Sequence, residues 1–598
     1  MNDGSTIGTP IRIESGLLTA TFAAGDLFDV RWDGVEVIQR LYLAVRDDAW
    51  NTIPASFANL VVTRDDKLTT IHFDARHEHG AIRYHWHGAV VAGADGGLSY
   101  EMRGQALQDF RYCKIGFNVH HGLRSHAGRT FRLRAQDGVH EDTFGSDVVP
   151  QLIRDGTLTA MTQHFDRLDI DLDGVDVSYR FEGDRFEMQD HRNWIDANWK
   201  TYGTPLEQGF PMDIHEGDEL YQRVTIALTG NSTGTSQSRG GAVDLIREES
   251  RSIHLPRIGH LLTVVPDEAQ LECLRAVQPD HIRVDLHPDA DLAARLAEAE
   301  TVARALNAGL EVGAFLRVEH AAEDAGTLAG VLAHCATRID RILVLAEVSG
   351  FSAFRGACPS DVSDLVREAL VEVGVDIPSI VSGTSQFFVD INRDRPDYAN
   401  IDGIVFAVNP QVHASDDRSV MQNPEAIPDV VDFARRLYGD VDVVMSPVDL
   451  IGFNGPFPAG PSQEGEGPAN QDPRQRASFC AAWTLAALAQ MARAGTASAT
   501  FFELVGPRGL LMDPERVFPV ADLLACVARM RSSRVVSLRT SDQDRVAALA
   551  FHQDGADVFL IGNLSQDPIS VRPPSAAEVT VPGYGVVLWS NHATDRIA

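Results

Sequence analysis

The chain has 598 residues, a length that predicts several domains rather than a single hydrophobic core. Its formal net charge of -32 argues against nucleic acid and anionic membrane surfaces as partners, because both are bound through basic faces. No window is apolar enough to predict a membrane-spanning helix, and the first residues lack the basic and apolar parts of a secretory signal, so we expect a cytoplasmic protein.

Residues 1–235 are predicted to form a large N-terminal β-sandwich. Short alternating segments punctuated by Gly, Asp and Asn turns are typical of half-buried strands, and helical periodicity is nearly absent. The clearest segments are residues 17–22, 60–62, 71–73, 82–86 and 131–134. Residues 186–203 are crowded with polar, charged and aromatic groups, so we expect a loop that lines a site rather than a strand.

Residues 236–256, rich first in Ser, Thr and Gly and then in charge, are predicted to be a connector. Residues 257–534 then alternate between strand and helix patterns, which predicts a central (β/α)8 TIM-like barrel. The predicted strands are residues 261–265, 281–286, 311–318, 341–348, 379–382, 403–408 and 441–445, and a last buried strand within 495–509. A doubly wound sheet would need fewer strands and usually a Gly-rich phosphate turn. Residues 535–598 return to short strands and predict a small C-terminal β-sandwich.

Polar residues follow most of the predicted barrel strands. In a parallel barrel the carboxyl ends of the strands meet the substrate, so we expect these side chains to converge on one cavity. They are Asp285, His287, Arg317, Glu347, Gln386, Asp390, Asn392, Asn409, Gln411, His413, Asp449, Asn454, Glu503 and Arg508.

Glu347, Glu503 and His413 are the candidate catalytic residues. Each glutamate is a lone acid after an apolar run, and two carboxylates facing one cavity can divide acid and base roles because each raises the pKa of the other. Alternatively, each glutamate pairs with an arginine, such as Arg317 or Arg508, and only closes the barrel. His413 fits a general acid/base or an oxyanion donor, or else a hydrogen-bonded histidine of the rim.

Substrate-binding candidates come from both large domains. The segment around residue 190 offers groups that suit hydroxyl and carboxylate recognition and an indole face for a sugar ring, although an internal salt-bridged loop is the alternative. The candidates there are Asp190, Arg192, Asn193, Trp194 and Lys200, and those in the barrel are Asp285, Arg317, Gln411 and Arg508.

No metal and no other cofactor is expected. Asp285 and His287 share a strand face and could be two metal ligands. However, the first strand has no H-x-H pair and the fourth has no lysine, as a metal-dependent amidohydrolase would require. The chain also lacks a phosphate-binding loop, an H-E-x-x-H motif and the G-x-S-x-G of serine hydrolases.

Several stretches resemble the D-apionate lactonases of bacterial apiose catabolism. They are V-R-D-D-A-W-N-T-I-P from Val45, I-G-F-N-V-H-H from Ile115, F-E-M-Q-D-H-R-N-W-I-D-A-N-W-K-T-Y from Phe186, N-P-Q-V-H-A-S-D-D from Asn409, D-P-R-Q from Asp472 and F-F-E-L-V-G-P-R-G from Phe501. The resemblance implies a β-sandwich, a barrel and a small β-domain. It also implies hydrolysis of a branched aldonolactone to the free acid.

We therefore expect a hydrolase that opens a sugar lactone by carboxylate acid/base catalysis. One glutamate would activate water, the other would protonate the leaving ring oxygen, and Arg317, His413 or Lys200 would stabilise the oxyanion. A glycoside hydrolase using the same two glutamates is the alternative, and a non-catalytic carbohydrate-binding protein is the third. The expected partner is a small sugar lactone or aldonate; the sequence leaves the oligomeric state open.

Overall fold

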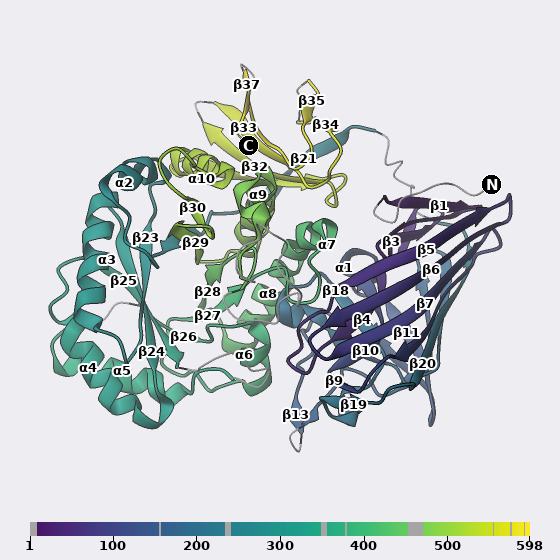
Figure 1. Ribbon diagram of the computed structural model, residues 1–598. Helices are drawn as coiled ribbons and strands as arrows, with labels where there is room; N and C mark the ends of the chain where they lie inside the picture. Colours follow the sequence, from purple (N-terminus) through teal and green to yellow (C-terminus); the bar gives the residue numbers. More distant parts are fainter. Residues whose placement is uncertain are drawn as a thin grey trace. The chain divides into compact units, whose positions relative to one another are not determined.

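The computed structural model describes residues 9–154, 157–233, 241–347, 356–376, 379–452, 470–553, 555–574, 577–590 and 593–597. These residues form two compact units. The first contains the described residues up to 192 and residues 197–233, and the second contains residues 193–196 together with the described residues from 241 onward. Figure 1 labels the elements of both units.

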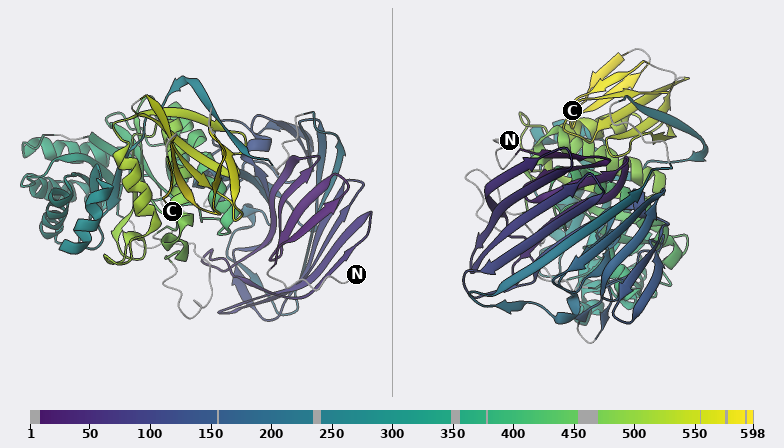
Figure 2. Two further views of the ribbon diagram at one scale, coloured as in Figure 1. Left: turned by 90° about the horizontal axis from the view of Figure 1, so that it is seen from above. Right: turned by 90° about the vertical axis from the view of Figure 1, so that its right-hand side faces the viewer.

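The first unit is built from two large antiparallel sheets, shown in Figure 2, as predicted. The seven-stranded sheet has the order β1-β2-β3-β4-β10-β18-β17. Its strands are β1 (Ile11–Ser15), β2 (Leu18–Ala23), β3 (Asp26–Trp32), β4 (Val35–Arg46), β10 (Lys114–Gly122), β17 (Glu187–Asp190) and β18 (Asn198–Tyr202). A single hydrophobic core draws on both sheets, and the rings of Tyr100 and Phe117 meet in it with centroids 4.7 Å apart.

The second sheet of this unit has the order β12-β11-β15-β16-β20-β8-β7-β6-β5. Its strands are β5 (Ala55–Arg64), β6 (Leu68–His79), β7 (Ile82–Gly93), β8 (Gly97–Ala106), β11 (Thr130–Ala135), β12 (Gly138–Thr143), β15 (Phe165–Leu172), β16 (Val175–Glu182) and β20 (Glu219–Gly230). Short elements complete the unit: α1 (Leu123–His126), η2 (Leu206–Gln208), and the small sheets β9 (Phe110–Tyr112) with β19 (Met212–Ile214) and β13 (Ile153–Arg154) with β14 (Thr157–Leu158).

The prediction of a loop over residues 186–203 is wrong for most of that segment. It forms β17, the 3-10 helix η1 (His191–Trp194) and β18, and the two strands pair with each other. The polar composition suggested a loop, but polar side chains of these strands are accommodated by hydrogen bonds to each other. Tyr202, for example, donates a hydrogen bond of 2.7 Å to Glu187 across the two strands.

The second unit contains a closed barrel of eight parallel strands, as predicted. The strands run in chain order from β22 to β29, and β22 pairs with β29 to close the ring. They are β22 (Arg257–Leu261), β23 (His281–Leu286), β24 (Gly309–Leu316), β25 (Ile339–Ala346), β26 (Ser379–Gly383), β27 (Gly403–Val408), β28 (Asp442–Val448) and β29 (Ser498–Val505). A short strand, β30 (Gly509–Leu511), extends the sheet beyond β29.

Helices surround this barrel (Figure 1). The α-helices are α2 (Glu268–Leu274), α3 (Leu292–Leu306), α4 (Ala321–Leu332), α5 (Ser360–Glu372), α6 (Phe388–Asp394), α7 (Asp417–Gln422), α8 (Ile427–Tyr438), α9 (Ser478–Ala494) and α10 (Pro519–Arg529). Single 3-10 turns lie between them: η3 (Arg275–Val277), η4 (Val318–His320), η5 (Asn423–Ala426) and η6 (Pro473–Arg476).

The first barrel strand lies earlier in the chain than predicted. The sequence favoured the apolar run at 261–265, but Val264 and Val265 are exposed and the strand ends at Leu261. Gly259 belongs to the strand because the ring of His281 packs where a β-carbon would lie, 2.2 Å from its position. His260 is tolerated because its Nδ1 lies 2.6 Å from the carbonyl oxygen of Phe501.

A buried polar layer fills the barrel near the amino ends of its strands. Glu311 of β24 accepts hydrogen bonds of 2.6 Å from Ser446 and from Thr500. Burial alone would raise the pKa of Glu311, but the charges of His281, Arg341 and Arg283 keep it below its usual value. Because side chains alternate along a strand, every second residue between this layer and the carboxyl ends also faces the barrel interior.

The C-terminal residues form a strand-rich sheet with the order β35-β34-β21-β31-β32-β33-β36-β37. Its strands are β21 (Val243–Ser252), β31 (Arg534–Thr540), β32 (Val546–Gln553), β33 (Ala556–Asn563), β34 (Ile569–Arg572), β35 (Val579–Val581), β36 (Val586–Ser590) and β37 (Ala593–Arg596). The segment predicted as a connector over 236–256 therefore contains a strand of this sheet. Arg493 of α9 donates to the carbonyl oxygen of Leu538 and pairs with Glu248, which ties the sheet to the barrel.

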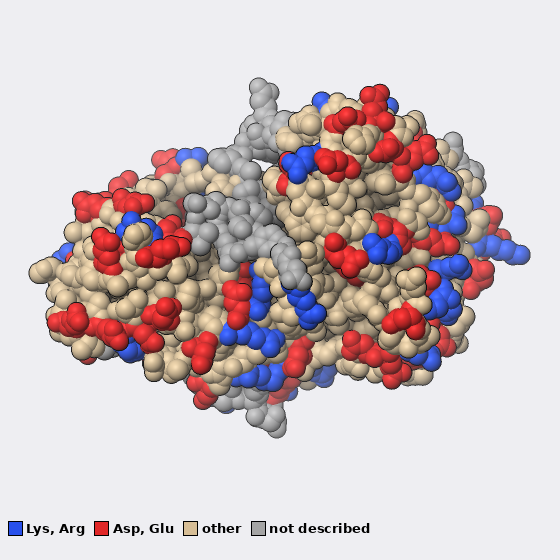
Figure 3. Space-filling model, turned by 90° about the horizontal axis from the view of Figure 1, so that it is seen from below, with Lys and Arg blue, Asp and Glu red and all other residues tan. Residues whose placement is uncertain are grey.

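Acidic and basic side chains are interspersed on the face that Figure 3 displays. The whole chain has 84 acidic and 52 basic residues. Among the helices that the structure describes, none combines the length and apolar character needed to cross a membrane. The six cysteines are free thiols.

Candidate active site

Two polar side chains meet across β24 at the carboxyl end of the barrel. His287 continues the row of alternate side chains of β23, and Glu347 continues that of β25. His287 Nδ1 lies 2.6 Å from Glu347 Oε2, and the imidazole stacks on Phe315 of β24 with centroids 4.2 Å apart. This pair is partly open to solvent, since 44% and 28% of the two side chains are exposed.

A bulge in β29 determines where Glu503 points. Residues three apart in a regular strand face opposite sides, yet Thr500 reaches the barrel interior and Glu503 also binds groups at the barrel mouth. The register of β29 against β22 shifts between Thr500 and Glu503, and Phe502 has a φ of 52°. Bulges of this kind re-aim side chains beside functional sites. Phe502 is neither Gly nor Asn, so no local pattern predicts this conformation.

Arg508 lies between two buried carboxylates. Its Nε donates to Glu503 Oε1 at 3.0 Å, and its Nη2 lies 3.2 Å from Asp449 Oδ2. Glu503 Oε2 also accepts a hydrogen bond of 2.8 Å from Thr263, which follows β22. The guanidinium further donates to the carbonyl oxygen of Asn470 at 2.5 Å, so several contacts fix its position.

Asp449 follows β28, whose register against β29 also shifts, between Met445 and Val448. Burial raises the pKa of Asp449 to about 6, and the charge of Glu503 adds to the increase, while Arg508 and Arg283 oppose it. A carboxyl group with a raised pKa at the end of a barrel strand is a candidate for proton transfer. The sequence offered Asp449 only as one polar residue among many at strand ends, because its burial could not be foreseen.

A small hollow, partly open to solvent, lies where β26, β27 and β28 end. Its polar lining comes from Ser385, Gln386, Asn409 and Asp449, and its apolar lining from Phe387, Ala407, Val408, Pro447 and Gly452. The hollow therefore brings a buried carboxylate into contact with space that a small polar molecule can occupy.

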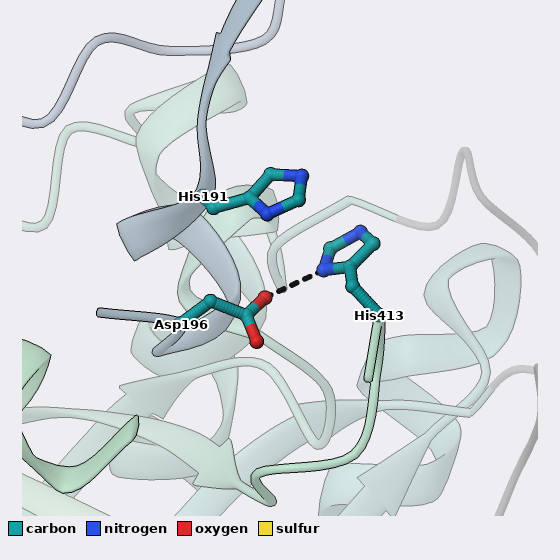
Figure 4. Close-up of side chains that lie close together, drawn as sticks. All are labelled: His191, Asp196 and His413. Atoms are coloured by element: carbon teal, nitrogen blue, oxygen red, sulfur yellow. Dashed lines mark hydrogen bonds and ion pairs between the residues drawn. The ribbon is translucent and has the colours of Figure 1, made fainter. Parts of the chain in front are cut away.

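The loop after β27 carries His413, whose imidazole is held by Asp196. His413 Nδ1 lies 2.5 Å from Asp196 Oδ2 (Figure 4). Asn423 donates to Asp196 Oδ1 at 2.9 Å. The indole of Trp194 meets the imidazole edge-on with centroids 5.0 Å apart. Trp194 also packs on the apolar cluster that includes Phe387, which lines the hollow. Asp196 and His413 are residue types that bind metal ions.

Two family models match the chain. That of the D-apionate lactonase N-terminal domain matches residues 3–231, and that of the D-apionate lactonase TIM barrel domain matches residues 263–532. The chain belongs to the D-apionate lactonase family. This assignment confirms the resemblance seen in the sequence and, with it, the prediction of an enzyme of the lactonase class.

A D-apionate lactonase from Brucella anthropi is 26% identical over 612 residues, which covers 97% of each chain. Among solved structures, a glycoside hydrolase family 30 subfamily 8 xylanase from Clostridium acetobutylicum aligns at 10% identity with a TM-score of 0.39, covering 59% of this chain and 99% of that chain. A β-arabinopyranosidase aligns at 11% identity with a TM-score of 0.31, covering 97% and 96%. TM-scores in this range carry no functional argument.

The other barrel candidates of this family member are held by polar partners. Asp285 accepts from Arg283 at 2.7 Å, and Arg317 pairs with Asp324 of α4 at 2.5 Å. Gln411 donates to Asp472 at 2.6 Å. Asp285 and His287, the D-x-H pair considered as metal ligands, thus have different partners, Arg283 for the first and Glu347 for the second.

The candidates near residue 190 divide between the two units. Asn193 and Trp194 belong to the second unit, where Asn392 donates to Asn193 at 2.9 Å. Asp190, Arg192 and Lys200 belong to the first unit. Arg192 binds Asp190 through Nε and Nη2 and also donates to the carbonyl oxygens of Gly145 and Asp147. Lys200 lies in β18, with Nζ 4.9 Å from the ring centroid of Tyr202.

Glu347 and Glu503, the two predicted catalytic glutamates, are not paired with each other. Their strands are separated by three others in the closed ring, so they stand on opposite sides of the barrel mouth. Glu503 makes the arginine contact that was the alternative, with Arg508, and Glu347 pairs with a histidine instead. The sequence thus located the polar groups of the mouth but not their pairing.

Proposed function

We propose that the chain hydrolyses a sugar lactone of the D-apionolactone type to the aldonic acid, at the carboxyl end of the barrel. The observation that carries this proposal is the pair of buried carboxylates, Glu503 and Asp449, on either side of Arg508. Such an arrangement offers a base for water and a cation for a developing oxyanion in one place. Membership of the D-apionate lactonase family favours an ester bond over a glycosidic bond as the one that is cleaved.

The reaction needs two proton transfers and one stabilised negative charge. A carboxylate removes a proton from water, and the water oxygen attacks the ring carbonyl. A protonated group then donates a proton to the ring oxygen as the carbon–oxygen bond breaks. Glu503 and Glu347 are the candidate carboxylates from the sequence, and His413, held by Asp196, is the third candidate. General acid and base assistance contributes about 10²–10⁴-fold each.

Recognition of the lactone hydroxyls is proposed for polar side chains around the mouth. Asp285 lies near the end of β23 and Gln411 follows β27. Trp194 offers an aromatic surface to a sugar ring, a contact that suits the apolar face of such rings. A small, uncharged polyol-like substrate also agrees with the acidic composition of the chain, which would repel polyanions. Operation in apiose catabolism and in the cytoplasm belongs to the same proposal.

The test is release of acid from a panel of lactones at constant pH, with branched apionolactone beside linear pentono- and hexonolactones. We expect the branched lactone to be opened fastest. A matched panel of aryl glycosides tests the glycoside hydrolase alternative. Glu347→Gln and Glu503→Gln are then assayed on the same lactones. If both variants keep the full rate, the glutamate mechanism is wrong even when the wild type is a lactonase.

A further inference from the structure

Asp449 differs from the other carboxylates of the mouth in how its oxygens are used. Both oxygens of Glu503 are engaged, one by Arg508 and the other by Thr263. Glu347 is held by His287. Asp449 lines the hollow, and its buried Oδ2 atom has Nη2 of Arg508 at 3.2 Å as an ion-pair partner, in a poorly directed contact, with no well-formed hydrogen bond from the described residues.

A buried carboxylate oxygen without a well-formed hydrogen bond is costly, because an ion pair alone repays its desolvation only in part. Proteins keep such groups where a ligand, a water molecule or a proton completes them. The polar side chains of Ser385, Gln386 and Asn409 line the same hollow, so a bound molecule would find hydroxyl and amide groups within the space that Asp449 faces. This combination of one ionisable group and three neutral polar groups suits a polyhydroxylated, uncharged ligand.

We propose that Asp449 is the catalytic base of the lactonase reaction, and that the hollow at the ends of β26, β27 and β28 receives the lactone carbonyl and its attacking water. This inference rests on the proposed function and assigns the proton transfer to one residue. Glu503 is then a positioning residue, whose charge acts on Asp449 and on Arg508 rather than on the substrate.

The proposed step balances with water as the only co-reactant. The carboxylate of Asp449 takes one proton from water while the water oxygen bonds to the carbonyl carbon, and the carbonyl oxygen becomes an oxyanion near the guanidinium of Arg508. The bond from that carbon to the ring oxygen then breaks, and the proton on Asp449 passes to the ring oxygen. The hydroxy acid leaves and loses its own proton to solvent, which restores the enzyme.

The charges around Asp449 suit a base that works near neutral pH. Arg508 and Glu503 face it from the segment of β29 and the turn that follows, Arg283 faces it from β23, and the thiol of Cys480 faces it from α9. Burial and Glu503 raise the pKa of Asp449 to about 6, while the two arginines prevent a further rise. The group is therefore mostly ionised at pH 7 and more basic than an ordinary carboxylate.

The decisive experiment compares Asp449→Asn with Glu503→Gln. If Asp449 is the base, Asp449→Asn lowers kcat/KM by about 10²–10⁴-fold and removes the ascending limb of the pH profile. Glu503→Gln keeps that limb but moves it to lower pH, because a like charge beside Asp449 is lost. The assignment is overturned if Glu503→Gln loses the ascending limb of the pH profile while Asp449→Asn keeps both that limb and the wild-type kcat/KM.

Asp340→Asn is the matched control. Asp340 has a side chain that is 8% exposed and that pairs with Arg257 and Arg338 at the opposite end of the barrel, so its substitution tests the cost of losing a largely buried charge without touching the mouth. We expect its pH profile to match that of the wild type. Thermal unfolding of all three variants separates loss of structure from loss of chemistry.

A measurement on the wild type keeps the inference falsifiable if Asp449→Asn does not fold. The kcat/KM of the wild-type enzyme must rise through about pH 6, and a profile that stays flat there overturns the proposal. If the wild type opens no lactone at all, the proposed function fails. If it opens lactones without this limb, only the role of Asp449 fails.

Discussion

Replacing Arg508 by Met removes the cation between the two buried carboxylates of the mouth. Arg508 lies 3.2 Å from Asp449 and 3.0 Å from Glu503, and methionine fills a similar volume without charge. An opposite charge at this distance lowers the pKa of a carboxyl group, so its removal raises the pKa of Asp449. Glu503 then acts on Asp449 without compensation and drives the pKa in the same direction.

The size of the effect follows from that distance. Loss of a contacting opposite charge moves a carboxyl pKa by about 1–3 units, each worth about 1.4 kcal/mol. Starting from about 6, Asp449 is about nine-tenths ionised at pH 7 in the wild type. A rise of about one unit leaves about half of the molecules ionised, and a rise of about three units leaves about one in a hundred. We therefore expect kcat/KM at pH 7 to fall by between about 2-fold and about 100-fold.

The assay is the pH profile of kcat/KM for lactone opening. The electrostatic effect predicts that Arg508→Met recovers activity at alkaline pH, where Asp449 ionises again. Arg508→Lys keeps the charge and should keep the acidic limb near that of the wild type. A loss that is equal at every pH would refute the pKa effect, because it would mean that Arg508 acts only on the oxyanion and does not set the pKa of Asp449.

Three further predictions concern the barrel and its rim. Glu311→Gln should destabilise the barrel at neutral pH by about 3–5 kcal/mol, because it leaves buried arginines uncompensated. Because the pKa of Glu311 is lowered in the folded state, its contribution to the free energy of unfolding is present above the unfolded pKa of about 4.3 and is lost as the pH falls through the folded-state pKa. In chemical denaturation, the free energies of unfolding of the wild type and Glu311→Gln should therefore converge in acid. Leu343 lies in the apolar interior cluster with Val381 and Val405, so Leu343→Ala should lower the free energy of unfolding by about 2–5 kcal/mol and leave the pH profile of kcat/KM unchanged. A shifted pH profile would argue against a purely structural role. For Asp196→Asn and His413→Gln, the double variant should lose little more kcat/KM than either single variant, since the two side chains are bonded at 2.5 Å; additive losses would show that they act separately.

The order of barrel strands was predictable because burial on both faces leaves a clear pattern. The strands at 281–286 and 403–408 begin and end where the sequence places them, since continuous apolar or alternating runs stop at polar residues. The first strand was displaced because Gly259 and His260 belong to it for reasons of interior packing. Such contacts involve residues far apart in the chain, and no local pattern records them.

The candidate site was predictable as a set of residues but not as a geometry. Strand ends gave Glu347, Glu503 and His413 from position alone, whereas the partner of each depends on bulges and on the loops. The bulge at Phe502 re-aims Glu503 towards Arg508, and a phenylalanine gives no local signal for a left-handed backbone. Asp449 was underrated for a related reason: its raised pKa arises from burial and from Glu503, which only the closed barrel brings near.

Two carboxylate centres at one barrel mouth raise the question of which one carries the chemistry, and solvent exposure decides in favour of Asp449. The Glu347–His287 pair is about a third exposed, so water screens its charges and lets both groups reorient. Asp449, Glu503 and Arg508 are each less than a tenth exposed, and charges held in such surroundings act more strongly on a neighbouring transition state. Glu347→Gln should therefore lower kcat/KM less than Asp449→Asn, measured on the same lactone at one pH. The reverse order would identify Glu347, on the β25 side of the barrel, as the catalytic base instead.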